Sequence, residues 1–336
     1  MDHVAIDLGG RESQICVRSS DGQIIDERRC RTAALPAYLA TRPRSRVVVE
    51  TCSEAFGIAD AAMAAGHEVR VVPSTLARSL GVGARRLKSD RRDARALSEV
   101  SCRIDLPSVH IPSREARDHK TMCGMREALV RTRTKLVNTV RGWLRAEGRR
   151  PRSGELTTFA ARVRELYAEM MLPAHVARQL RVLESLNEEI AGADRELATT
   201  AKADPIAARL MTVPGVGPST SVRFVAALDD ISRFGGAHAV ESYLGLVPGE
   251  DSSAERKRRT AITKAGPSAL RWCLVQAAWA ARRTRRKDPM HRWVDEVEKR
   301  RGKRVAVLAL ARKLAGILFA IWRDGTVYDP HRSGAV

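Results

Sequence analysis

The order of apolar patterns in the N-terminal third of the chain constrains the fold most. In residues 4–9 apolar side chains alternate with others before a Gly-Gly pair, which predicts a strand that ends in a turn. Two further extended segments, 13–18 and 22–30, are joined by an Asp-Gly pair, which is typical of a hairpin turn. We therefore expect three antiparallel strands at the start of the chain.

The next segments add two strands separated by helices. Residues 45–51 contain a Val-Val-Val run suited to a strand buried on both faces, and residues 67–73 predict a fifth strand. Helical patterns cover residues 33–40 and 53–65, and the pattern turns helical again from Ser74. This β-β-β-α-β-α-β-α order is the one found in α/β ribonuclease-H-like folds, in which the first and fourth strands lie side by side.

Four acidic residues occupy notable places in that order. Asp7 lies on the first strand, Glu50 ends the fourth, and Asp90 and Asp93 stand three residues apart in the last helical segment. Among Lys88 and several arginines, Asp90 and Asp93 taken alone predict a solvated, salt-bridged helix face. If the first and fourth strands are neighbours, however, Asp7 and Glu50 converge. The four carboxylates could then hold Mg²⁺ for phosphoryl transfer.

The charge of the chain favours a polyanionic partner. It has 59 Lys and Arg against 39 Asp and Glu, a net charge of +20 and a pI of about 10.6, so nucleic acid is the expected partner. Aromatic residues make up 4% of the chain, too few for a base-stacking platform, so contacts to the phosphate backbone should dominate.

Membrane and disulfide classes are disfavoured. No uninterrupted apolar run approaches the ~18 residues of a spanning helix, and the N-terminus lacks the pattern of a signal peptide. The six cysteines are scattered without a C-x-x-C pair or zinc-type spacing. We expect a cytoplasmic protein with reduced thiols and no membrane partner.

Three short motifs resemble one family. Residues 6–9, 49–51 and 88–94 are similar to those of the DEDD transposases of the IS-one-ten / IS-eleven-eleven insertion sequences, whose N-terminal domain resembles the Holliday-junction resolvase RuvC. The resemblance implies that the four acids are catalytic and bind Mg²⁺.

The middle of the chain is helical. Apolar residues recur at three- and four-residue steps from Arg114 to Glu147 and from Ala174 to Lys202, which predicts a long antiparallel arm. The resemblance makes this arm a coiled-coil connector and oligomer contact, and an ordinary helical spacer remains an equal alternative. We expect a RuvC-like domain over residues 1–112, the connector over 113–203, a mainly helical transposase domain over 204–328 and a tail over 329–336.

A glycine-rich turn opens the C-terminal region. Residues 207–220 have the pattern of a helix-hairpin-helix, in which Gly215 and Gly217 would bring backbone N–H groups against a DNA phosphate. The alternative is a tight turn between helices that packs and binds nothing. The charge of +20 favours DNA.

Residues 242–271 resemble the second block of the same family, which implies a catalytic serine at Ser253. The glycine that usually follows is Ala254 here, and Ser252 remains a possible substitute. Because a serine hydroxyl is a weak nucleophile at neutral pH, it needs a base, a metal or strong electrostatic stabilisation. The basic residues expected to contact nucleic acid in this block are Arg256, Lys257, Arg258, Arg259, Lys264 and Arg271.

The resemblance implies a DNA transposase or recombinase. In such an enzyme the serine attacks the DNA backbone and forms a covalent phosphoserine, in a homo-oligomer (dimer or tetramer) guided by a structured bridge RNA. Two alternatives stay open: a RuvC-like metal-dependent junction nuclease, which needs the acids but not Ser253, and a non-catalytic nucleic-acid-binding protein, which needs neither.

Overall fold

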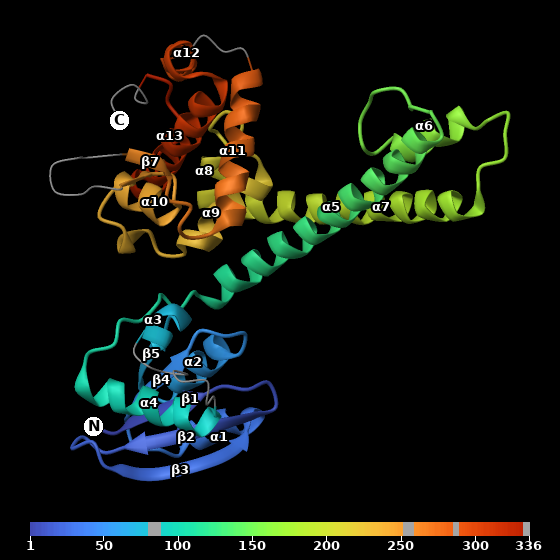
Figure 1. The fold of residues 1–336 in the computed structure, drawn as a ribbon. Coiled ribbons are helices and arrows are strands. Elements are labelled where there is room, and N and C mark those ends of the chain that lie inside the picture. The colour runs from blue at the N-terminus through green and yellow to red at the C-terminus, as the bar shows by residue number, and fades with distance from the viewer. Residues whose placement is uncertain (80–88, 251–258, 285–288, 332–336) are drawn as a thin grey trace. The chain divides into compact units, whose positions relative to one another are not determined.

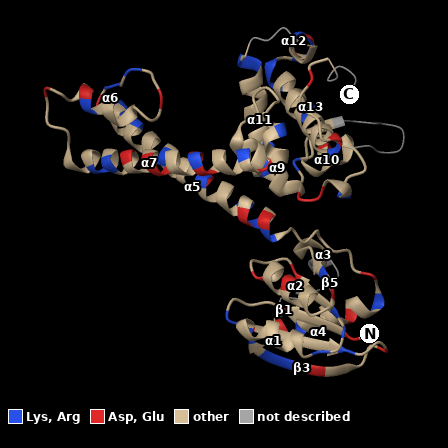
Figure 2. Ribbon diagram, turned by 180° about the vertical axis from the view of Figure 1, so that it is seen from behind, with Lys and Arg blue, Asp and Glu red and all other residues tan. Residues whose placement is uncertain are grey.

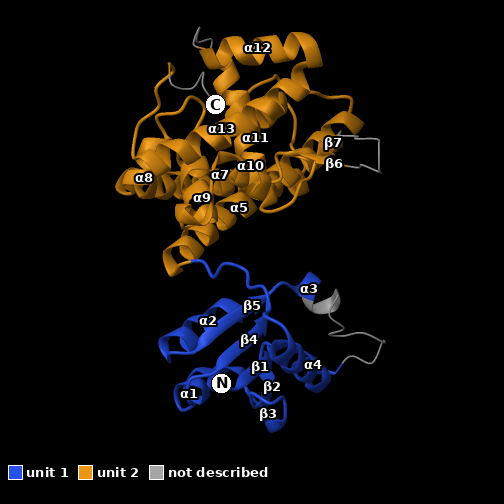
Figure 3. Cartoon of the chain, turned by 90° about the vertical axis from the view of Figure 1, so that its left-hand side faces the viewer, with its two compact units in different colours: residues 1–112 blue, residues 113–336 orange. Residues whose placement is uncertain are grey.

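The chain forms two compact units, Met1–Pro112 and Ser113–Val336 (Figure 3). The computed structural model describes residues 1–79, 89–250, 259–284 and 289–331. The further division of the second unit at residues 203 and 328 stays a prediction.

Unit 1 is built on a five-stranded mixed sheet. Its elements are β1 (His3–Asp7), β2 (Glu12–Arg18), β3 (Ile24–Arg31), α1 (Leu35–Ala40), β4 (Arg46–Glu50), α2 (Ala55–Ala64), β5 (Glu68–Val72), α3 (Ser74–Ser79) and α4 (Asp90–Arg103) (Figure 1). The strand order is β3-β2-β1-β4-β5, with β1, β2 and β3 antiparallel and β4 parallel to both β1 and β5. The predicted pairing of the first and fourth strands is confirmed.

Helices cover both faces of this sheet. Odd and even residues of β1 and β4 point to opposite faces, so Val4 and Val47 pack with α1 and α2, whereas Ala5 packs with Leu97 of α4. The side chain of His3 lies 2.8 Å from Ser101, also on α4. Since Ala5 follows His3 and Leu97 precedes Ser101, α4 runs antiparallel to β1.

The start of α4 differs from expectation. The sequence predicts a helical pattern that runs from Ser74 into the Asp90 region, but α4 begins at Asp90. Ser89 has an extended backbone, and its side chain accepts a hydrogen bond from the backbone N–H of Arg92. This N-cap satisfies a free helical N–H group and fixes the helix start. Asp90 and Asp93 therefore lie in the first turn of a helix.

Unit 2 combines a long two-helix arm with a helical bundle. Its elements are α5 (Arg114–Ala146), α6 (Phe159–Leu166), α7 (Ala174–Ala203), α8 (Pro205–Leu210), α9 (Pro218–Leu228), α10 (Ala237–Tyr243), β6 (Pro248–Glu250), β7 (Arg259–Ile262), α11 (Ser268–Arg283), α12 (Pro289–Arg301) and α13 (Lys303–Asp324). Val140 and Leu144 near the end of α5 pack with Val176 and Leu180 near the start of α7. The predicted antiparallel arm is confirmed (Figure 1).

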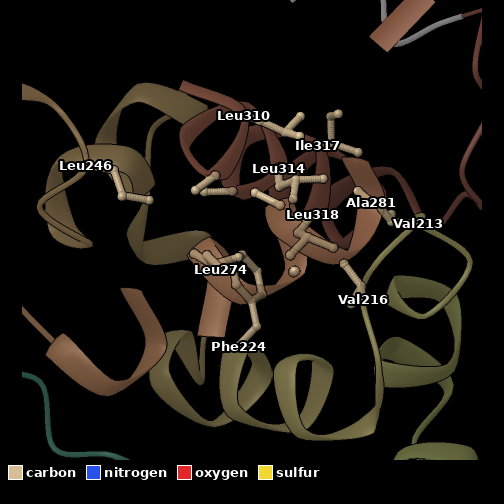
Figure 4. Close-up of a cluster of buried hydrophobic side chains, with 14 of the residues drawn as sticks. Val213, Val216, Phe224, Leu246, Leu274, Ala281, Leu310, Leu314, Ile317 and Leu318 are labelled. Carbon is tan, nitrogen blue, oxygen red and sulfur yellow. The ribbon is translucent and has the colours of Figure 1, made fainter. Parts of the chain in front are cut away.

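The core of the bundle surrounds α13. Leu310, Leu314 and Leu318 of this helix lie among buried side chains of α9 and α11 (Figure 4). Within the described chain α13 is the one helix long and apolar enough to cross a membrane, but 61% of its apolar stretch is buried in the protein. Packing in this core accounts for its apolar sequence. The short antiparallel pair β6–β7 was not expected from the sequence.

Candidate functional site

The carboxyl ends of β1 and β4 bring two of the predicted acids to one edge of the sheet. Asp7 is the last residue of β1, and Glu50 is the last residue of β4. The two strands are parallel neighbours in register. Ala5 and Val48, each two residues earlier, face α4. Because side chains alternate along a strand, Asp7 and Glu50 lie on the same α4 face.

The first turn of α4 supplies the other two acids. Asp90 is exposed, whereas Asp93 is only 8% exposed. Among the described residues, the Asp93 carboxylate has no hydrogen-bond or ion-pair partner. Both acids interact favourably with the positive end of the helix dipole, and burial of an unpaired carboxylate is otherwise unfavourable. No cation among the described residues therefore offsets the free-energy cost of burying the Asp93 carboxylate.

Helix and strand geometry places Asp93 level with Asp7. At the opposite end of the sheet, His3 contacts Ser101. From Ser101 back to Asp93 the helix rises ~12 Å, and from His3 to Asp7 the strand rises ~13 Å. Because the two elements run antiparallel, Asp93 and Asp7 lie at the same end of the sheet.

The acids nevertheless do not form a metal centre in this arrangement. Across residues 1–79, 89–250, 259–284 and 289–331, no three His, Cys, Asp or Glu side chains lie close enough to hold one metal ion. The structure brings Asp7, Glu50 and Asp93 to one end and one face of the sheet, with Asp90 exposed on the same helical turn. Carboxylate oxygens are suitable ligands for Mg²⁺, but these side chains do not converge closely enough to surround one ion.

Two arginines beside these acids are already engaged. Arg91 Nε donates to Glu27 Oε2 at 2.7 Å, and Arg95 Nη2 donates to the same oxygen at 2.8 Å. Glu27 lies on β3, and these bonds from Arg95 and Arg91 lower its pKa to about 2. The guanidinium groups of Arg91 and Arg95 are therefore paired with a carboxylate of unit 1. Sequence reasoning missed Glu27, since only strand pairing brings β3 near α4.

Tight connections hold the strand ends that carry the acids. After β1, a Cβ atom on Gly9 would lie 2.3 Å from the backbone oxygen of Glu12, so only glycine fits this turn. The Thr32 hydroxyl donates to the Gly9 carbonyl oxygen at 2.6 Å. After β4, the Thr51 hydroxyl accepts from the backbone N–H of Ser74 at 3.1 Å. These contacts fix the backbone that follows Asp7 and Glu50.

The proposed nucleophile lies outside the described residues. Ser253, its alternative Ser252, Arg256, Lys257 and Arg258 belong to residues 251–258, which connect β6 to β7. Arg259 is the first residue of β7, and its side chain is likewise outside the description.

Arg271 has a structural partner that the sequence did not reveal. Its Nη1 atom donates to the carbonyl oxygens of Leu244 at 3.0 Å and Ala265 at 2.8 Å. The side chain therefore ties the loop before α11 to the end of α10. A role in nucleic-acid binding stays a prediction for this residue.

The same loop forces an unusual backbone conformation on Lys264. Its φ angle is +57°, a left-handed value that is unfavourable for residues other than glycine, and its side chain is exposed. Gly245 and Gly266 allow the loop to approach α10, since a Cβ on Gly266 would lie 1.9 Å from the Tyr243 oxygen. The exposed Lys264 ammonium is consequently held on a closely packed loop.

The glycine-rich hairpin joins α8 to α9, as expected, but one of its glycines faces the protein. Gly215 has a φ of +83°, and a Cβ there would lie 2.2 Å from the carbonyl oxygen of Ala277 on α11. Val213 and Val216 are buried beside the same core (Figure 4). Gly217 differs, because no atom lies within 4 Å of its Cβ position. Packing therefore explains Gly215, and nucleic-acid contact by either glycine stays a prediction.

Two models of transposase families match separate regions of the chain. A transposase family model matches residues 4–147, and the model of the IS116/IS110/IS902 transposase family matches residues 207–293. The transposase of insertion sequence IS1328 from Yersinia enterocolitica is 30% identical, with 97% of this chain and 98% of that protein aligned.

Other relatives align over almost their full length. The transposase of insertion sequence IS1111A from Coxiella burnetii is 28% identical over 99% of this chain and 92% of its own. A probable family 20 transposase from Pseudomonas aeruginosa is 29% identical over 98% and 99%. The chain belongs to the IS110/IS1111 family of insertion-sequence transposases, enzymes that cleave and transfer DNA strands.

Proposed function

We propose that unit 1 is a ribonuclease-H-like, RuvC-like domain whose four acids form the metal-binding half of the transposase active site. The strand order β3-β2-β1-β4-β5 supports this proposal. The observation that carries it is the placement of Asp7, Glu50 and Asp93 at the same end of the α4-covered sheet face. Asp93 is buried and its carboxylate pairs with no described residue, and a carboxylate of this kind is stabilised by a bound cation.

Asp7, Glu50, Asp90 and Asp93 would hold Mg²⁺ here. The bound ion would neutralise the negative charge that builds up on the phosphate during strand cleavage. Before metal binds, the carboxylates repel both one another and DNA. The arginines of α4 reduce that repulsion, although Arg91 and Arg95 are themselves shared with Glu27.

The second half of the proposal assigns the nucleophile to Ser253 in unit 2. Its Oγ would lose its proton to water and form a bond to the phosphorus of the DNA backbone. The bond to one neighbouring deoxyribose oxygen would break, and that oxygen would take up a proton and leave as a hydroxyl group. Lys264 supports this assignment, because it is exposed and lies two residues after β7, the strand that begins directly after residues 251–258. A fixed cation near the attacked phosphate lowers the free energy of the transition state.

The partners follow from the same proposal. DNA ends and target are the substrates, a structured bridge RNA supplies target choice, and a homo-oligomer joined through the coiled-coil arm brings acids and serine together. The net charge of +20, carried by basic residues in both units (Figure 2), suits two polyanions in one complex. The site of action is the cytoplasm, where the DNA lies.

Trapping of covalent protein–DNA adducts tests the proposal. Purified wild type, Asp93→Asn and Ser253→Ala are incubated with element-end DNA, the flanking noncoding RNA and either Mg²⁺ or EDTA. We expect an adduct only in wild type with Mg²⁺. Omission of the RNA should abolish the adduct, and this separates RNA guidance from chemistry.

The other outcomes select the alternatives. Adducts at wild-type yield in Ser253→Ala would make the serine assignment wrong, and Ser252→Ala is then tested. Strand cleavage without any adduct, retained in Ser253→Ala, identifies a metal-dependent nuclease. DNA binding with no Mg²⁺-dependent product in any sample identifies a non-catalytic binding protein.

A further inference from the structure

The end of the arm that carries α6 contains a basic pocket. It lies between the last turns of α5, the connection over residues 148–158 and the start of α6, and its volume is about 380 Å³. Half of its lining residues are arginines, namely Arg141, Arg145, Arg149, Arg150, Arg152 and Arg162. None of the described residues that line it is acidic. We call it the arm-tip pocket.

Some arginines elsewhere on the arm pair with carboxylates. Arg126 of α5 pairs with Asp194 at 2.8 Å, and Arg164 of α6 pairs with Glu184. In the pocket, within the described chain, only Arg152 approaches an acid, Glu165 at 3.9 Å. Several positive charges thus crowd one pocket, with a single carboxylate beside them among the described residues, and an external anion would relieve their repulsion.

Aromatic packing holds two of these guanidinium groups in place. Arg141 lies over the ring of Phe159 at 5.4 Å, and Arg149 lies over the ring of Tyr167 at 4.7 Å. A guanidinium group stacked on a ring keeps its N–H edges available for hydrogen bonds to an anion. The cations are therefore ordered before any ligand arrives, which reduces the entropy lost on binding.

A third arginine is positioned by the connection itself. Arg162 Nη1 donates to the Thr158 hydroxyl at 2.5 Å, while its buried Nε has no hydrogen-bond partner among the described residues. Gly154 admits this side chain, because a Cβ there would lie 2.2 Å from Arg162 Nη1. The Thr158 hydroxyl therefore holds the Arg162 guanidinium group at the pocket, where it adds a further positive charge.

We propose that the arm-tip pocket binds the phosphodiester backbone of a nucleic acid. Planar guanidinium groups match the paired oxygens of a phosphate. Base recognition is disfavoured, because Phe159 and Tyr167 are 1% and 7% exposed and offer no free face for stacking. This site goes beyond the proposed function, since it involves neither the acids nor Ser253; it rests on that function only for nucleic acid being the polyanion.

Binding measured against salt concentration tests the pocket in the full-length protein. Arg145 and Arg150 are exposed pocket residues, whereas Arg178 and Arg181 are exposed on α7 at the same end of the arm and do not line it. The pocket variant Arg145→Gln/Arg150→Gln and the control Arg178→Gln/Arg181→Gln lose equal charge. Each is titrated, in EDTA, with a DNA duplex and with an RNA hairpin of unrelated sequence.

We expect the pocket variant to bind at least one of these probes about tenfold more weakly, with a slope of log K against log salt smaller by about 2. The control variant should stay near wild type. The probe that loses affinity tells whether the backbone is DNA or RNA. Wild-type binding of both probes by the pocket variant, or equal weakening by both variants, would overturn the proposal.

A second measurement separates binding from folding. Phenylglyoxal modifies exposed arginines, so saturating nucleic acid should protect Arg145 and Arg150 in the wild-type protein more than Arg178 and Arg181. Equal protection of both pairs counts against the pocket. Because EDTA removes metal-dependent chemistry, failure here leaves the assignment of the acids and Ser253 untouched.

Discussion

The acids of unit 1 and the glycine-rich loops of unit 2 relate differently to the fold. Asp7 and Glu50 end strands whose other residues build the core. In unit 2, Gly215 and Arg271 were both expected to contact nucleic acid, yet both hold backbone segments together. Residues that the sequence singles out alike can therefore end a core strand in one unit and join backbone segments in the other.

This contrast has a physical cause. A carboxylate at the end of a buried strand projects beyond the core, so the strand is specified by its apolar neighbours. In contrast, the fold requires glycine wherever the φ angle is positive and another backbone segment lies against it, because a Cβ atom would be strained there and would clash. Substitutions should therefore affect activity in the first case and stability in the second.

Asp93→Asn should have the largest effect. Loss of one carboxylate ligand should lower Mg²⁺-dependent strand cleavage by about 10³-fold, equivalent to about 4 kcal/mol. The melting temperature should stay close to wild type, because the amide has the same shape and removes from a buried position a charge that no described residue pairs. Cleavage assays and thermal unfolding measure the two quantities on one preparation.

Asp60→Asn, on α2, serves as a control for the loss of one negative charge away from the α4 face. If Asp93→Asn unfolds the protein while Asp60→Asn does not, Asp93 is a structural residue and the contrast between the two units fails.

Gly215→Ala should destabilise the protein by about 3 kcal/mol, because the new methyl group meets the α11 backbone and the φ angle of +83° disfavours alanine. Gly217→Ala in the same hairpin should cost no more than about 1 kcal/mol, since its Cβ position is open. Urea unfolding compares the variants. Equal destabilisation of both would show that hairpin flexibility, and not contact with α11, explains the glycines.

Arg271→Gln should lower the free energy of unfolding by about 2 kcal/mol through loss of two bonds to backbone carbonyls. The exposed Arg292→Gln on α12 removes the same charge and should leave unfolding near wild type. If Arg271→Gln is as stable as this control but binds DNA more weakly, the original nucleic-acid assignment is right and the packing role is wrong.

Glu27→Gln should have the smallest effect, about 1 kcal/mol at neutral pH. The folded state holds the pKa of Glu27 near 2, below its ordinary value of 4.5, so the carboxylate stabilises the protein above that ordinary value. This contribution is lost as pH falls through about 2. The difference in unfolding free energy between wild type and Glu27→Gln should accordingly be constant at neutral pH and shrink below pH 4.5. A difference that grows on acidification would contradict the ion pair.

Much of the fold was readable because its signals are local. Alternating and β-branched runs predicted the five strands, the Asp21-Gly22 hairpin formed as expected, and three- and four-residue periods located the arm. The start of α4 was misjudged, because a single N-cap at Ser89 interrupts a sequence that reads as helix on both sides. The pair β6–β7 was missed, since its strands are too short to show a period.

Sequence by itself determined which acids lie at strand ends and that the chain favours polyanions, because strand position and charge depend on neighbouring residues and composition. Only the tertiary structure decided that Glu27 engages Arg91 and Arg95, that Gly215 packs on α11, and that six arginines line one pocket at the arm tip. Each of these depends on segments distant in the chain coming together, which local patterns do not encode.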